Sequence, residues 1–100
     1  MYIKKASVSG ELIPLVKCYA NFIGSIYHMV TGHVMVITSI RDGKHMKGSL
    51  HYVGKAFDVR SRDMSDSELT TFLHLVKQEC DSRLDIVKES NHIHIEYDPH

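Results

Sequence analysis

Apolar residues recur every three or four positions near the start of the chain, which predicts an amphipathic helix. This helix is expected from Ser9 to Met29, with Ser9 as its N-cap and Pro14 in its first turns. Gly32 is a plausible stop signal. The expected apolar face consists of Leu12, Leu15, Val16, Tyr19, Phe22, Ile23, Ile26 and Tyr27.

A second helix is predicted to begin at Ser65 and to end near Asp81. Glu68 follows Ser65 by three residues, which is the spacing of a capping box, where each side chain bonds to the backbone of the other residue. The expected apolar face consists of Leu69, Phe72, Leu73 and Val76.

Four segments have the β-branched, apolar or alternating composition of strands. In chain order they cover residues 33–39, 55–61, 84–89 and 92–98. Alternation in the second segment places Ala56 and Asp58 opposite to Phe57 and Val59. Residues 40–49 are rich in turn formers and are expected to form a loop. Together the elements predict an α+β fold, in which two helices pack on one face of a small antiparallel sheet.

The last two strands are separated only by Ser90 and Asn91, and such a two-residue connection predicts a β-hairpin. This register places Glu89 directly opposite His92. Since side chains alternate along a strand, one face then carries Val87, Glu89, His92, His94 and Glu96. The other face carries Ile86, Lys88, Ile93, Ile95 and Tyr97. An ordinary half-solvated sheet has the same pattern, so the hairpin alone does not indicate a function.

The 100 residues, of which 43 % are hydrophobic and 24 % charged, indicate one globular domain, residues 1–100. Twelve Lys and Arg balance twelve Asp and Glu, which argues against binding to nucleic acid or to an anionic membrane. We expect no membrane span, no signal peptide and a monomer. Cys18 and Cys80 fit no metal-binding spacing and are expected to be buried thiols.

Histidine is unusually frequent, at eight residues, and three of the eight stand near other potential metal ligands. His51 precedes Asp58 by seven positions, and His92 and His94 are separated by one residue on the last strand. A catalytic zinc takes three protein ligands and keeps a fourth position for water. His51, Asp58 and one histidine of the pair would meet that need. Gly54 is small and would let the backbone pass close to a metal or substrate.

Two stretches, TSIRDGKHMKGSLHYVGKAFDVR and ESNHIHIEYDP, together resemble the zinc D-Ala-D-Ala carboxypeptidase family. These peptidoglycan peptidases include phage endolysins and belong to a larger superfamily with the hedgehog signalling domain. The resemblance runs from about Val34 to Pro99. The matching pattern is S-x-H, then x-x-G-x-A-x-D, then H-x-H, and here it consists of Ser49, His51, Gly54, Ala56, Asp58, His92 and His94.

The resemblance implies a role for each matching residue. His51, Asp58 and His94 match the ligands of one zinc ion, on the open face of a hedgehog-like sheet. Arg41 matches an arginine that grips the substrate's carboxylate, and Ser49 matches a serine that helps to hold the substrate. The implied reaction is hydrolysis of an amide bond in a peptidoglycan stem peptide. Without the family, Arg41 is equally well a surface loop residue and Ser49 a turn hydroxyl.

The sequence departs from many relatives at the catalytic base. Those relatives place an acidic residue three positions before the last ligand, where this chain has Asn91. Hedgehog-like relatives place a glutamate further back, and the hairpin puts Glu89 on the same face as His94. We therefore expect Glu89 to be the base. His92 beside it would polarise a carbonyl or stabilise an oxyanion, and Glu96 is the alternative base.

Other functions remain open at this point. Because Asn91 replaces an acid, the chain is alternatively a non-catalytic, hedgehog-like binding module that keeps zinc for its structure. A third possibility is a metal-free domain with His51 and Asp58 as a surface pair. The sequence does not specify which peptide bond would be cut. A short catalytic domain without signal peptide or wall-binding repeats suits a phage lysin made in the cytoplasm, or a virion-packaged enzyme, that acts on the cell wall.

Overall fold

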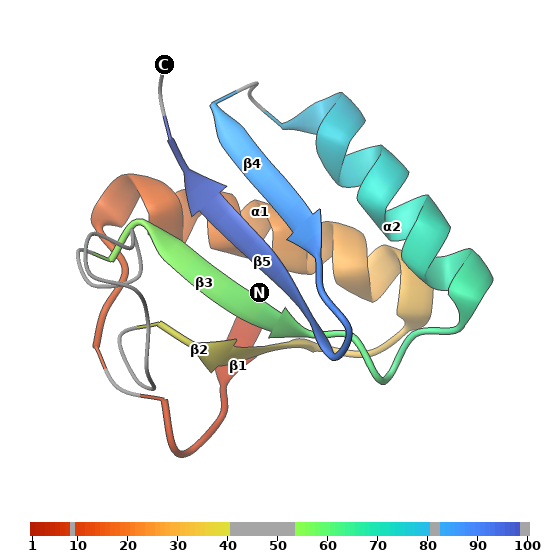
Figure 1. Cartoon of the computed structure of the whole chain (residues 1–100), viewed down its shortest axis with the longest axis horizontal. Coiled ribbons are helices and arrows are strands. Elements are labelled where there is room, and N and C mark those ends of the chain that lie inside the picture. Colours follow the sequence, from red (N-terminus) through yellow and green to blue (C-terminus); the bar gives the residue numbers. More distant parts are fainter. Residues whose placement is uncertain (9, 41–53, 81–82, 99–100) are drawn as a thin grey trace.

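The computed structural model describes residues 1–8, 10–40, 54–80 and 83–98. In this part of the chain the elements are β1 (Tyr2–Lys4), α1 (Pro14–Thr31), β2 (Met35–Ser39), β3 (Ala56–Arg60), α2 (Asp66–Glu79), β4 (Leu84–Lys88) and β5 (His92–Tyr97). They form an α+β fold, as the sequence predicts (Figure 1).

The five strands form one sheet in the order β1-β2-β3-β5-β4. The pairs β2–β3, β3–β5 and β4–β5 are antiparallel, as expected. The edge strand β1 runs parallel to β2, so the sheet is mixed and the prediction of a purely antiparallel sheet is wrong. A strand of three residues is too short to show alternation, and its partner β2 follows only after α1. Its pairing therefore left no pattern to detect in the sequence.

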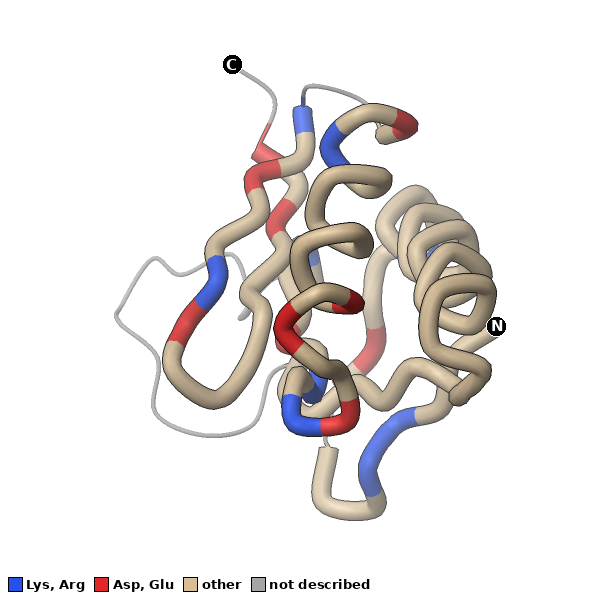
Figure 2. Tube along the Cα trace, turned by 90° about the vertical axis from the view of Figure 1, so that its right-hand side faces the viewer, with Lys and Arg blue, Asp and Glu red and all other residues tan. Residues whose placement is uncertain are grey.

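Both helices lie on one side of the sheet and leave its other face open (Figures 1 and 2). Alternate strand residues point toward the helices and are fully buried: Met35, Ile37, Phe57, Val59, Ile93 and Ile95. The helices contribute Val16, Ala20, Ile23, Phe72 and Val76 to the same core. An edge-to-face contact between Tyr27 and Phe72, with ring centroids 5.5 Å apart, joins the two helices.

The first helix begins at Pro14, five residues later than predicted. The proline ring excludes the preceding residue from the helical region, and Ile13 is accordingly extended, with φ −64° and ψ 153°. Ile13 is the N-cap and has no side-chain capping bond, so the prediction of Ser9 as the cap is wrong. At the other end Gly32 has a φ of 76° and donates its N–H to the His28 carbonyl, which confirms the predicted stop.

The capping box of the second helix is confirmed. The Glu68 backbone N–H donates to Ser65 Oγ at 3.2 Å, and the Ser65 N–H donates to Glu68 Oε1 at 2.9 Å. The helix ends at Glu79, two residues before the predicted end. Of the predicted apolar face, Phe72 and Val76 are buried, whereas Leu69 and Leu73 are partly buried.

The two cysteines are free thiols, and they differ in environment. Cys18 is exposed, so the expectation of a buried thiol is wrong for this residue. At 3.6 residues per turn it lies about 200° around α1 from both Val16 and Ala20, which face the core. Cys80 is partly buried, and this burial raises the pKa of its thiol.

Gly54 is required by the packing of the chain against the segment that precedes α1. Its φ is 74°, and a Cβ atom there would lie 2.6 Å from the backbone oxygen of Glu11. The Ile13 N–H also donates to the Gly54 carbonyl at 3.0 Å. Among the described residues, the neighbours that demand a small residue are backbone atoms of residues 11–13. The expected approach to a metal or substrate stays a prediction.

Gly54→Ala should destabilise the fold more than Gly32→Ala. Both glycines have a left-handed φ, which for alanine costs about 1–2 kcal/mol. A Cβ at Gly32 would meet no atom within 4 Å, whereas one at Gly54 would collide with the backbone. Denaturant unfolding of the two variants separates the conformational effect from the steric one. Equal losses of unfolding free energy would mean that the contact with Glu11 relaxes without penalty.

Candidate functional site

The hairpin register predicted from the sequence is confirmed. The Glu89 N–H donates to the His92 carbonyl at 2.9 Å and closes the turn. Further along, Val87 pairs with His94, and Asp85 pairs with Glu96. Because side chains alternate, His92, His94 and Glu96 share the open face of the sheet with Glu89 and Asp85.

Strand β3 brings Asp58 to the same face. In the β3–β5 pairing Asp58 lies opposite His94, and Arg60 lies opposite His92. Asp58 is the one buried charged or polar residue in the described part of the chain, at 9 % exposure. A carboxylate held this deep in a sheet requires polar partners, and the histidines of β5 are placed to supply them.

Both ring nitrogens of His94 face carboxylates. Nδ1 lies 3.1 Å from Asp58 Oδ1, and Nε2 lies 2.8 Å from Glu96 Oε1. The hydrogen bond to Asp58 is the main reason why the pKa of His94 is raised above its usual value. Glu96 acts in the same direction, and partial burial opposes both. Both carboxylates therefore favour the doubly protonated ring more than water does.

His92 has a defined orientation next to this pair. Its Nδ1 lies 2.7 Å from Asn91 Oδ1, and a carboxamide oxygen only accepts hydrogen bonds. The proton of a neutral His92 is therefore on Nδ1. This leaves the Nε2 lone pair on the side of Asp58, whose Oδ2 lies 3.8 Å away. In this orientation a neutral His92 can accept a proton at Nε2, and it can stabilise an oxyanion only after it has done so.

Asp58 and His94 have donor atoms and a spacing that a tetrahedral zinc ion would fit. Two zinc–ligand bonds of 2.0–2.1 Å at a tetrahedral angle separate their donor atoms by about 3.3 Å. The observed separation of Asp58 Oδ1 and His94 Nδ1 is 3.1 Å. The other predicted ligand, His51, lies outside the described residues, as do Arg41 and Ser49.

Glu89, the expected base, is exposed at the end of β4. Its backbone pairs with that of His92, so the two side chains are cross-strand neighbours. Its carboxylate makes no hydrogen bond or ion pair with any residue that the structure describes. The alternative base, Glu96, is instead engaged with His94 Nε2.

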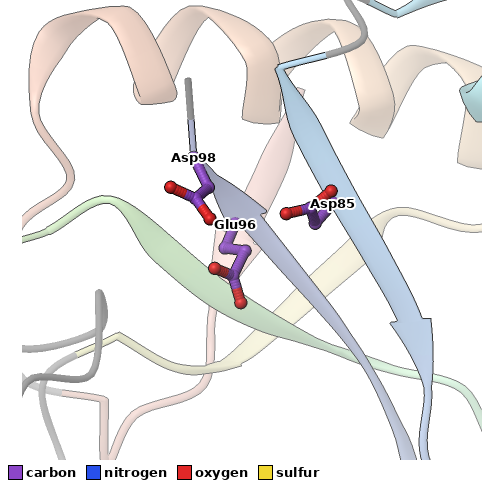
Figure 3. Close-up of side chains that lie close together, drawn as sticks. All are labelled: Asp85, Glu96 and Asp98. Atoms are coloured by element: carbon purple, nitrogen blue, oxygen red, sulfur yellow. The ribbon is translucent and has the colours of Figure 1, made fainter. Parts of the chain in front are cut away.

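Figure 3 shows a group of three carboxylates that we did not foresee from the sequence. One of them, Glu96, contacts His94. One oxygen from each of Asp85, Glu96 and Asp98 lies within 4.8 Å of the other two. The pairing of Asp85 with Glu96 follows from the predicted hairpin register, so the register was the signal from which this group could have been found. Exposed acidic groups of this kind are common without a bound ion. What the group adds here is negative potential at the end of β5.

A polar pocket of about 610 Å³ borders Asp58 toward the His92 end of β5, away from these carboxylates. Three cationic side chains line it, from Lys5, Arg60 and Arg62, and His92 forms part of its wall. The remaining lining is mainly hydroxyl and carboxamide side chains. The contribution of Lys5 was not foreseeable, because it depends on the parallel strand β1.

The chain matches no protein-family model, no curated protein and no solved structure. Within the described part of the chain, neither helix is long and apolar enough to cross a membrane. The interpretation of the site therefore depends on its own geometry and on the residues that the sequence pattern singled out.

In the metal-free protein, Asp58→Asn should lower the pKa of His94, because it removes the charge of the principal hydrogen-bond acceptor. A histidine whose folded pKa is raised stabilises the fold fully below the unfolded value of about 6.5, and this stabilisation is lost as pH rises through the folded pKa. The variant should thus lose stability mainly on the acidic side of that value.

NMR titration of the His94 ring protons, with unfolding measured at several pH values, checks this prediction. Asp85→Asn is the matched control, since Asp85 contacts neither ring nitrogen of His94. If the two variants shift the His94 titration equally, the cause is the general negative potential and not the bond to Asp58.

Proposed function

We propose that this chain is a zinc-dependent peptidase that hydrolyses an amide bond in peptidoglycan stem peptides. The observation that carries the proposal is the pairing of Asp58 with His94. These residues are 36 positions apart and match two zinc ligands of the peptidase family, and their donor atoms lie 3.1 Å from each other. A pattern read along the sequence thus corresponds to a cluster in space.

The contacts of His94 also suit a zinc ligand. A ligating histidine usually donates its second ring N–H to a carboxylate, which fixes the tautomer and the ring orientation. His94 would bind through Nδ1 and donate from Nε2 to Glu96 Oε1. In this proposal Asp58 and His51 complete the protein ligands, and Glu96 is a positioning residue. Zinc in such a site supplies Lewis acidity and makes water nucleophilic at neutral pH.

The residues around the ligands then handle the proton and the substrate. The Glu89 carboxylate takes a proton from the attacking water and passes it to the leaving amine. His92 beside it is set to accept a proton at Nε2 and, once protonated, to stabilise negative charge on the carbonyl oxygen. Arg41 and Ser49 hold the substrate. Glu89 is favoured over Glu96 because the Glu96 carboxylate is already committed to His94.

Digestion of purified peptidoglycan, followed by mass spectrometry of the released muropeptides, tests the proposed function. We expect new peptide termini with the zinc-reconstituted protein and none after chelation. Metal analysis should find one zinc per chain, and binding should be lost in His94→Ala. If zinc and peptidoglycan bind but no bond is cut, the chain is a zinc-containing binding module. If zinc does not bind, the proposal is wrong.

Glu89→Gln and Glu96→Gln should separate the proton acceptor from the positioning residue. Loss of the proton acceptor should reduce hydrolysis by roughly 10²- to 10⁴-fold while zinc affinity is retained. Glu96→Gln removes the carboxylate that His94 Nε2 contacts. It should instead weaken zinc binding by about 10- to 100-fold and leave much of the activity at saturating zinc. Activity and zinc affinity, measured for both variants on one substrate, decide the assignment. If Glu96→Gln is inactive with zinc bound, Glu96 is the base.

A further inference from the structure

The polar pocket beside Asp58 has a cationic lining that plays no part in the proposed reaction. Its walls carry three cations, Lys5, Arg60 and Arg62, against one carboxylate, that of Asp58. With a volume of about 610 Å³ it is large enough for part of a peptide. The pocket adjoins the proposed ligands directly, because Asp58 belongs to both. The pocket is therefore within reach of a molecule that binds at the proposed zinc site.

Arg60 is the best placed of the three cations. It lies two residues after Asp58 on β3, so its side chain is on the same face, opposite His92. Its side chain is only 24 % exposed, and its contact with Asp63 is 4.0 Å long. Charge-assisted hydrogen bonds are about 2.7–2.9 Å, so Asp63 does not occupy the donors of this guanidinium. Within the described part of the chain, Lys5 and Arg62 make no ion pair.

Two groups of like charge lie at different ends of the open face. The carboxylates of Asp85, Glu96 and Asp98 lie near the C-terminal end of β5. The cations of the pocket, Lys5, Arg60 and Arg62, lie at the His92 end, where the exposed Glu89 also lies. The imidazole of His94 lies between the two groups. A ligand with a negative group is therefore attracted to the pocket and repelled from Asp85, Glu96 and Asp98.

We propose that this pocket binds a free carboxylate of the peptide substrate, and that Arg60 is its principal donor, supported by Lys5 and Arg62. The inference rests on the proposed peptidase function and specifies its substrate class. Two residues along a strand span about 6–7 Å, so the carboxylate belongs to the residue next to the scissile amide. The planar guanidinium suits a carboxylate better than the neutral amide that replaces it in amidated stem peptides. The preferred substrate is thus the acidic, non-amidated peptide.

Binding of a matched pair of peptides to the chelator-treated protein tests the inference without catalysis. The probes are L-Ala-D-Glu-containing stem peptides with the glutamate carboxylate free or amidated, titrated to millimolar concentrations and followed by NMR. We expect the free acid to bind about five- to tenfold more tightly, with a difference that shrinks as salt is added. Arg60→Gln and Lys5→Gln should reduce this preference. Lys88→Gln, a cation on the opposite face of β4, should leave it unchanged.

The outcomes keep this inference distinct from the proposed function. A preference for the acid that Arg60→Gln abolishes supports the pocket even if no bond is ever cut. Equal binding of acid and amide by the native protein, including no binding of either, overturns it. So does hydrolysis with the same kcat/KM for both peptides, which would leave the peptidase proposal standing.

Discussion

The pairing of Glu89 with His92 across the β4–β5 turn is the interaction on which the open face depends. Side chains alternate along a strand with a period of two, so a slip of one residue would exchange the two faces of the hairpin. Ile93 and Ile95 would then point to solvent, and His92 and His94 would point into the core. Both isoleucines are fully buried in the observed register. The hydrophobic core thus selects the register that presents the histidines.

Charge balance is the second constraint on this face. Asp58 and Glu96 both contact the one ring of His94, and Asp58 is 9 % exposed. With a neutral imidazole, both carboxylates would face a ring that carries no positive charge. A proton on His94 provides compensation, and so would a divalent cation between Nδ1 and Asp58 Oδ1. Because a proton on Nδ1 and the proposed zinc ion would occupy the same place, protonation of His94 would compete with zinc binding.

The sequence predicts local features of this fold much better than distant ones. The hairpin and the capping box of α2 depend on residues two or three positions apart, and both are found as expected. The start of α1 was placed too early because the periodic apolar pattern outweighed the effect of Pro14 on Ile13. Strand β1 was missed because three residues carry no periodicity, and with it the position of Lys5 in the pocket.

The candidate site shows the same limit. Residue types suggested the proposed chemistry, which stays a prediction, and the resemblance pointed to Asp58 and His94 together. That these residues face each other depends on the pairing of β3 with β5, two strands separated by α2 and β4. No local pattern encodes that pairing, and only that pairing places Arg60 opposite His92. His51, Arg41 and Ser49 lie outside the described residues, so their part in the site stays a prediction.

The way the site is built explains how a small domain can hold such groups firmly. Asp58 lies between Phe57 and Val59 in the sequence, and His94 lies between Ile93 and Ile95. All four apolar neighbours are fully buried. A shift of β3 or β5 along its own direction would therefore also move these buried residues relative to the helices, and close-packed cores resist such a change strongly. Sites on strands that are anchored in this way keep their geometry better than sites on loops. The buried apolar face of the sheet thus fixes the position of the ionisable side chains on its open face.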